Sequence, residues 1–440
     1  MAKKPNLKFW QIWNLSFGFL GVQIGYSLQN SNTSTIFESF GANLSQLSYF
    51  WLAAPIAGLI IQPIIGLFSD GTWTRLGRRV PYILGGSIIS SLALSLMPNA
   101  NILITFAPLA MGALILLFMD LSFNVTMQPF RALVADMLDD KQKTKGYVVQ
   151  TFLINLGAVV GAFLPLILSK LGVSDAAAPG TVAKHIAYSY YIGGAILLLT
   201  VIVTSIRTKE YPPEEFAKYN SETLNQPIEK KSFWKLLKDL PTVMLQLSVV
   251  QFFSWAALFL MWTYLKPAIS GVVISHETGM ILSEGQTQTW VGVLNGIYPI
   301  PACIASLFIT GIAAKYGNKL IYSICLLFGA VGFIGLNFTT NQYALMIPMI
   351  GIGIAWAGIL AMPYAILSKA VEPRRMGVYM GIFNFTITIP QIAIGLLGGV
   401  LVQYVFGSNA MDMLVLAGVF MLIAAISVYF VKEKKLELND

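Results

Sequence analysis

The sequence predicts an all-α, polytopic membrane protein in which twelve transmembrane helices form two pseudo-symmetric six-helix bundles, with both termini in the cytoplasm. Three observations predict this fold class. The 440-residue chain is 56% hydrophobic and only 11% charged, with a mean hydropathy of +0.70, which excludes the soluble class. Long apolar runs recur along the whole chain. The basic residues gather in alternate connections between these runs.

Hydropathy predicts the individual spans and the division into bundles. The first bundle takes residues 1–206, a polar cytoplasmic loop takes residues 207–240, and the second bundle takes residues 241–440. The twelve expected spans are 10–36, 44–68, 80–98, 103–138, 144–171, 185–206, 241–269, 287–313, 319–338, 342–369, 376–406 and 410–431.

The distribution of positive charge sets the orientation. Of the 28 Lys and Arg residues, only Lys170, Lys184 and Lys266 are expected outside. The excess of positive charge behind the net charge of +8 is therefore expected in cytoplasmic loops next to the lipid bilayer. No nucleic-acid partner is expected. The chain starts MAKKPNLKFW, with no cleavable signal peptide expected. We expect a multi-pass monomer in the inner membrane of a bacterial cell.

The first span carries an unusual polar run. It includes Gln29, Asn30 and Asn32, inside a segment that hydropathy still places in the membrane. Amide groups there need hydrogen-bonding partners, which could be sugar hydroxyls or neighbouring helices. The density of the run favours the lining of a substrate cavity.

The connection after the second span, from Gly66 to Arg79, contains Asp70, Arg75, Arg78 and Arg79. It resembles the cytoplasmic loop motif of the major facilitator superfamily, where a glycine, an aspartate and a Gly-Arg-Arg cluster recur at this spacing. The carboxylate can lie against a helix amino terminus, and the arginines can bind acidic residues such as Asp136. We therefore expect a cytoplasmic gate. If the arginines only followed the positive-inside rule, Asp70 and the glycines would have no explanation.

The fourth span contains a carboxylate and a guanidinium. Asp120 and Arg131 are eleven residues apart, so on one helix they share a face and are separated by about 16 Å along the axis. A charge at the bilayer centre costs roughly 2.5–3.5 kcal/mol, so both must face protein or a water-filled cavity. A transport pathway is favoured, and a structural ion network is the alternative.

An internal repeat relates the two halves of the chain. Residues 128–133, QPFRAL, correspond to residues 362–367, MPYAIL. The loop 66–79 has a weaker counterpart in residues 311–319. Two parallel six-helix halves follow from this repeat. The second half has Ile354 and Ala365 where the first has Asp120 and Arg131. The charged chemistry is therefore expected in the first half alone.

Further amide and aromatic side chains could bind a sugar. Aromatic rings suit the apolar faces of pyranose rings and amides suit their hydroxyls, although Trp and Tyr near span ends more often belong to interfacial belts. Besides the amides of the first span, the candidates are Asn124, Gln128, Asn155, Gln251, Trp255, Asn295, Tyr298, Trp356, Asn384 and Gln391.

Four stretches carry a narrower resemblance. They are residues 25–29, 70–81, 120–136 and 381–391, and in them the chain is similar to the plant sucrose transporters and their animal and bacterial relatives, in the glycoside–pentoside–hexuronide:cation symporter branch. The resemblance implies that Asp120 is the proton-coupling carboxylate and Arg131 its functional partner. Residues 261–265, MWTYL, lack the acidic residues that the plant family has in the seventh span, which leaves the identity of the sugar open.

We therefore expect proton-coupled symport of a disaccharide or glucoside such as sucrose or maltose by alternating access. A sodium-coupled glycoside symporter and an efflux carrier are alternatives with the same fold. A non-transporting receptor is the alternative from another class. An enzyme is not expected, because the sequence offers neither a metal-ligand cluster nor a nucleophile–base pair, and no cofactor or metal is expected.

Overall fold

The structure is a computed structural model that describes residues 4–41, 44–174, 177–178, 180–219 and 233–432. Contacts divide the chain into two compact units. Unit 1 contains residues 1–139, 153–220 and 373–384, and unit 2 contains residues 140–152, 221–372 and 385–440. The centre of the expected cytoplasmic loop, residues 220–232, lies outside the described residues.

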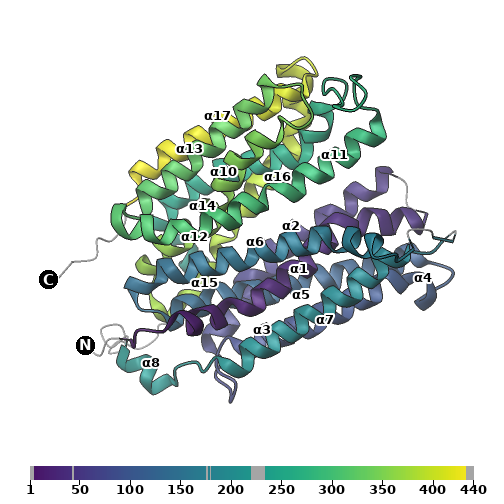
Figure 1. The fold of residues 1–440 in the computed structure, drawn as a ribbon. Coiled ribbons are helices and arrows are strands. Elements are labelled where there is room, and N and C mark those ends of the chain that lie inside the picture. Colours follow the sequence, from purple (N-terminus) through teal and green to yellow (C-terminus); the bar gives the residue numbers. More distant parts are fainter. Residues whose placement is uncertain (1–3, 42–43, 175–176, 179, 220–232, 433–440) are drawn as a thin grey trace. The chain divides into compact units, whose positions relative to one another are not determined.

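Unit 1 is a bundle of long helices. In Figure 1, α1, α3, α5 and α7 run along one another, with α1 packed on α7 and α3 packed on both α5 and α7. The helices of this unit are α1 (Phe9–Ser39), α2 (Leu44–Gly71), α3 (Val80–Leu96), α4 (Ala100–Leu103), α5 (Pro108–Met137), most of α6 (Asp140–Lys170), α7 (Lys184–Arg207), α8 (Pro213–Tyr219) and α15 (Met376–Phe383).

Unit 2 is likewise helical. Its α10 packs on α16 and α17, and its α13 packs on α14 and α17. The helices of this unit are α9 (Phe233–Lys238), α10 (Thr242–Ile269), α11 (Glu284–Ile297), α12 (Pro299–Tyr316), α13 (Asn318–Gly335), α14 (Met346–Ala370), α16 (Phe385–Val400) and α17 (Ala410–Ser427).

The membrane character expected from the sequence is present. In the described part of the chain, ten helices are long and apolar enough to cross a membrane. Two further helices, α1 and α2, are also long, with 31 and 28 residues. The polar run lowers the hydropathy of α1 without ending the helix. Its side chains find partners near and far in the sequence: Asn32 Nδ2 donates to the Leu28 carbonyl at 3.1 Å, and Thr33 Oγ1 lies 3.4 Å from the Tyr190 hydroxyl on α7.

Two short segments pack in the unit formed mainly by the other half of the sequence. The start of α6, residues 140–152, belongs to unit 2, whereas Leu153 onward belongs to unit 1. Residues 373–384, with α15, belong to unit 1, and α16 begins unit 2 again at Phe385. The chain therefore passes between the units inside continuous α6 but at a helix break between α15 and α16.

Candidate functional site

Asp120 lies inside unit 1 on α5, with only 2% of its surface exposed. Its Oδ1 accepts a hydrogen bond from Gln29 Nε2 on α1 at 2.5 Å. Among the described residues, Asp120 Oδ2 and Gln29 Oε1 have no hydrogen-bond partner. Buried polar atoms usually have partners, so a carboxylate in this position is a strong candidate for a functional group that binds and releases a proton.

A chain of amides continues from Asp120. Asn124 Nδ2 donates to the Asp120 carbonyl at 2.8 Å, and Asn124 Oδ1 accepts from Gln62 Nε2 on α2 at 2.7 Å. These bonds connect α1, α2 and α5 around one carboxyl group. One helical turn away, the Tyr26 ring on α1 meets the Phe123 ring on α5 edge to face, with ring centroids 5.8 Å apart. The carboxyl group is thus held by neutral donors in a mostly apolar environment.

Arg131 is half-buried on α5, and the side-chain partner of Asp120 is Gln29 rather than Arg131. Tyr26 on α1 lies close enough to both charged residues to interact electrostatically with each of them. The two charges therefore share one neighbourhood without forming a direct pair.

The other amides expected to bind substrate have different positions. Asn30 is exposed and lies near Tyr26, and Asn32 bonds within α1. Asn155 is fully buried on α6. Asn384 is buried at the break between α15 and α16, and Gln391 is half-buried on α16.

In unit 2, the aromatic candidates form one cluster. Trp356 on α14 contacts Trp255 and Trp262 on α10, with centroids 5.4 and 6.1 Å apart, and Tyr298 at the end of α11, at 6.1 Å. All of these contacts are edge-to-face. We call Trp255, Trp262, Tyr298 and Trp356 the aromatic cluster.

Polar atoms without partners lie beside the aromatic cluster. Gln251 is one helical turn before Trp255 on α10, and its Oε1 accepts from the Tyr322 hydroxyl at 3.0 Å. In the described part of unit 2, no partner is present for Gln251 Nε2, Trp255 Nε1 or Asn295 Oδ1, all of which are buried. Two donors and one acceptor next to flat rings are suited to a polyhydroxylated ligand.

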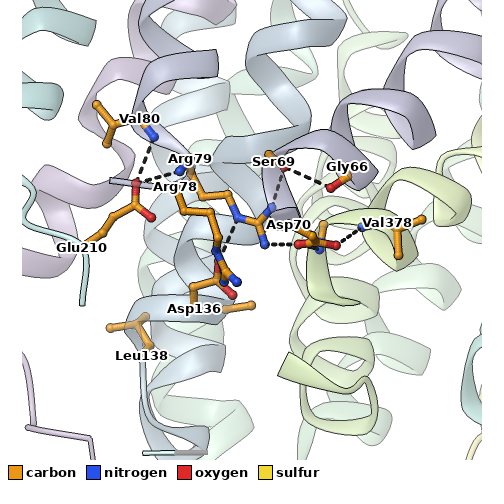
Figure 2. Close-up of polar contacts among 12 residues, drawn as sticks. Gly66, Ser69, Asp70, Arg78, Arg79, Val80, Asp136, Leu138, Glu210 and Val378 are labelled. Atoms are coloured by element: carbon orange, nitrogen blue, oxygen red, sulfur yellow. Dashed lines mark hydrogen bonds and ion pairs between the residues drawn. The ribbon is translucent and has the colours of Figure 1, made fainter. Parts of the chain in front are cut away.

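A network of charges lies where α2 ends and α3 begins (Figure 2). Arg79 is completely buried, with Nε 2.8 Å from Asp136, one terminal nitrogen 2.5 Å from Asp70 and the other 2.5 Å from Ser69. Arg78 binds the same Asp136 at 2.6 Å. We call Asp70, Arg78, Arg79 and Asp136 the charge network. Arg75, which the sequence placed with them, is exposed.

The charge network is anchored to the amino terminus of α15. The Asp70 carboxylate accepts from the backbone N–H groups of Gly377 at 2.9 Å and Val378 at 2.8 Å (Figure 2). Gln128 on α5 donates to the Gly377 carbonyl. A carboxylate at a helix amino terminus satisfies unpaired donors and complements the helix dipole. One short helix is thus held by α2 and α5 together.

A further carboxylate supports the arginines. Glu210, in the segment after α7, accepts from the backbone N–H groups of Arg79 at 2.8 Å and Val80 at 2.9 Å (Figure 2). Burial raises the pKa of Glu210, although these two donors favour its charged form. The contribution of this carboxyl to stability is therefore greatest at low pH and falls as the pH rises through the raised value.

Sequence reasoning missed four members of these sites: Gln62, Ser69, Glu210 and Gly377. An amide inside an apolar helix marks Gln62 as a candidate. Nothing in the sequence around Ser69, Glu210 or Gly377 singles out these residues. Glu210 stands among several charged residues of a polar loop, and Gly377 acts through its backbone.

A prediction concerns the close approach of α2 and α15. A Cβ atom on Gly66 would lie 2.3 Å from the Gly377 carbonyl oxygen, so Gly66→Ala cannot keep this contact. Overpacking of this kind costs about 1–3 kcal/mol, and we expect a lower midpoint of thermal unfolding in detergent. Gly71→Ala on the same helix is the control, since nothing lies within 4 Å of a Cβ there. Equal midpoints for the two variants would contradict the close contact.

Comparisons with known proteins agree with this architecture. The family model described as Major Facilitator Superfamily matches residues 15–283 and 256–440. A solved structure of the transporter FucP in the outward conformation superposes with a TM-score of 0.72 at 15% identity, over 97% of this chain and 99% of the other. The proton:xylose symporter XylE superposes with a TM-score of 0.70 at 12% identity, over 96% of both chains.

Relatives by sequence are more specific. The chain is 23% identical to the sucrose transport protein SUC4 of Arabidopsis thaliana, over 89% of this chain and 84% of the relative. It is 24% identical to the sucrose transport protein SUT1 of rice, Oryza sativa subsp. japonica, over 94% and 86%. A general alpha-glucoside permease of Schizosaccharomyces pombe is 25% identical over 63% of this chain and 50% of its own.

Proposed function

Because the chain belongs to the Major Facilitator Superfamily, we propose that it is a symporter that couples the uptake of a disaccharide or glucoside to the entry of protons by alternating access. Sucrose and maltose are the leading substrates. The substrate class rests on relatives named as sucrose transport proteins, which match most of both chains, and on a relative named as an alpha-glucoside permease.

The proposal includes a topology. Twelve spans would form an amino-terminal bundle of residues 1–206 and a carboxy-terminal bundle of residues 241–440, joined by the loop 207–240. Both termini would lie in the cytoplasm and the protein would be a monomer in the bacterial inner membrane. The ten membrane-length helices and the uneven distribution of Lys and Arg support this arrangement.

The single observation that carries proton coupling is the position of Asp120. It is a buried carboxyl on a membrane-length helix, held by the Gln29 amide and with Oδ2 unpartnered among the described residues. A carboxyl group that alternates between a wet and a dry environment can take up a proton on one side and release it on the other. Sugar and proton binding must then strengthen each other by the same factor. One proton per sugar is the simplest stoichiometry.

The sugar would bind against the aromatic cluster. Its rings offer flat apolar surfaces, and Gln251, Trp255 and Asn295 offer unsatisfied donors and an acceptor beside them. Asn124 and Gln128 are less suited to the role, because each already has a partner in unit 1. In this proposal, contacts with the aromatic cluster decide which sugar binds.

Uptake into proteoliposomes tests the proposal. With a pH gradient, acidic outside, we expect accumulation of labelled sucrose or maltose, and a protonophore should abolish it. A sodium gradient at equal pH on both sides should give no accumulation, since a lone carboxylate is a poor site for sodium, which prefers several oxygen ligands. In the described residues, no group of three or more His, Cys, Asp or Glu side chains could hold a metal ion. Accumulation driven by sodium alone would replace the proton in this proposal.

A further inference from the structure

Lys143, near the start of α6, is buried in unit 2. Only 5% of its surface is exposed, whereas Lys141, two residues earlier, is exposed. Its Nζ donates to the Ser368 carbonyl at 2.8 Å and lies 2.7 Å from Asp140 Oδ1. An ammonium group loses much hydration when it is buried, so this position requires good partners.

The partner of Lys143 is a helix end. Ser368 lies in the last turn of α14, which ends at Ala370, and carbonyls in the last turn of a helix lack an intrahelical partner. They also carry the negative end of the helix dipole, which a cation complements. The contact reverses the signs of the one in unit 1, where the Asp70 carboxylate binds the amino terminus of α15.

Two further residues on α6, close to Lys143, also contact helices of unit 2. Thr144 Oγ1 donates to Asn318 Oδ1, at the first residue of α13, at 3.1 Å. The Tyr147 ring stacks on the Tyr364 ring of α14, with centroids 5.9 Å apart. Lys143, Thr144 and Tyr147 thus hold residues 140–152 on the start of α13 and the last two turns of α14.

The path of the chain gives this docking a consequence. α6 runs without a break from Asp140 in unit 2 to Lys170 in unit 1. The passage from α15 to α16 has a helix break at Asn384, which can absorb a change in direction. A continuous helix cannot follow two units that move separately unless it bends or one of its contacts opens.

We propose that Lys143 is a positioning residue of the transport cycle, which holds the start of α6 on the carboxy-terminal end of α14 in one conformation and releases it in the other. This inference rests on the proposed alternating access. The contact would be a second gate contact, of opposite charge to the one that Asp70 makes on α15. If Lys143 had a purely structural role, its contact with Ser368 would stay closed during turnover, whereas a gate contact opens.

Cysteine labelling in the full-length protein tests the inference. Cys303→Ala and Cys325→Ala provide a cysteine-free background, and Ser368→Cys places one thiol at a buried position while keeping the backbone carbonyl. We expect slow labelling by a maleimide at rest. Lys143→Met should raise the rate about tenfold, as expected for the loss of a charged hydrogen bond. Lys141→Met should leave the rate unchanged, and Lys143→Arg, which keeps a charged donor, should bring it back toward that of the background.

The labelling results also separate this inference from the proposed function. If Lys143→Met and Lys141→Met label at the same rate, or if labelling at Ser368→Cys stays equally slow during sugar turnover, the inference is wrong. If Lys143→Met does not fold, Thr144→Val should accelerate labelling, and a rate equal to that of the background would overturn the inference. Failure of the unsubstituted protein to transport disaccharides would reject the proposed substrate while leaving the labelling difference as support for the gate.

Discussion

Asp120→Asn is expected to abolish proton-driven accumulation of sugar while leaving exchange of internal for external sugar largely intact. The amide keeps the size of the side chain and can still bond to Gln29, but it cannot take up and release a proton. With one proton per sugar, a gradient of one pH unit can support about a tenfold accumulation, because one unit corresponds to about 1.4 kcal/mol. In the variant the ratio of internal to external sugar should fall to about one, because an uncoupled carrier only equilibrates its substrate.

Glu277→Gln is the matched control for this variant. Glu277 is an exposed carboxylate in the segment between α10 and α11, so the substitution removes one negative charge away from the buried amides. Its accumulation should equal that of the unsubstituted protein. Accumulation by Asp120→Asn under the same pH gradient would show that another group carries the proton.

The helical architecture could be predicted because its main determinant is local. Long apolar runs specify membrane-length helices whatever surrounds them, and the ten apolar helices follow these runs. The polar run of α1 was less predictable, since its place in a helix depends on Tyr190, far along the chain. The exchange of residues 140–152 and 373–384 between the units depends on tertiary contacts, for which a hydropathy pattern has no signal.

The candidate sites show the same division. Asp70, Arg78, Arg79 and Asp136 could be selected from the sequence because charges are rare in this chain and these stand at span ends. The direct contact of Asp120 with Gln29 rather than Arg131 could not, since it depends on how α1 turns its face toward α5. Backbone groups such as those of Gly377 carry no residue-specific signal at all.

Arg79→Met is expected to have the largest effect on stability, about 3–5 kcal/mol, because it removes the common partner of the buried Asp136 carboxylate and the partly buried Asp70 carboxylate. Although burial disfavours the charged guanidinium, Asp136 and Asp70 hold the pKa of Arg79 above its usual value, so the residue stays charged. Arg79→Lys should recover only part of the loss. One ammonium group cannot reproduce bonds from three guanidinium nitrogens to Asp136, Asp70 and Ser69.

The measurement is the free energy of unfolding in mild detergent titrated with a denaturing detergent. Arg75→Met, in the same loop, is the control, because Arg75 is exposed and a surface substitution usually changes stability by less than about 0.5 kcal/mol. If the charge network also holds α15 in place, Arg79→Met should raise the labelling of a thiol introduced by Val378→Cys, since Val378 is buried and its N–H binds Asp70. Equal unfolding free energies for Arg79→Met and Arg75→Met would mean that the buried arginine contributes no net stability.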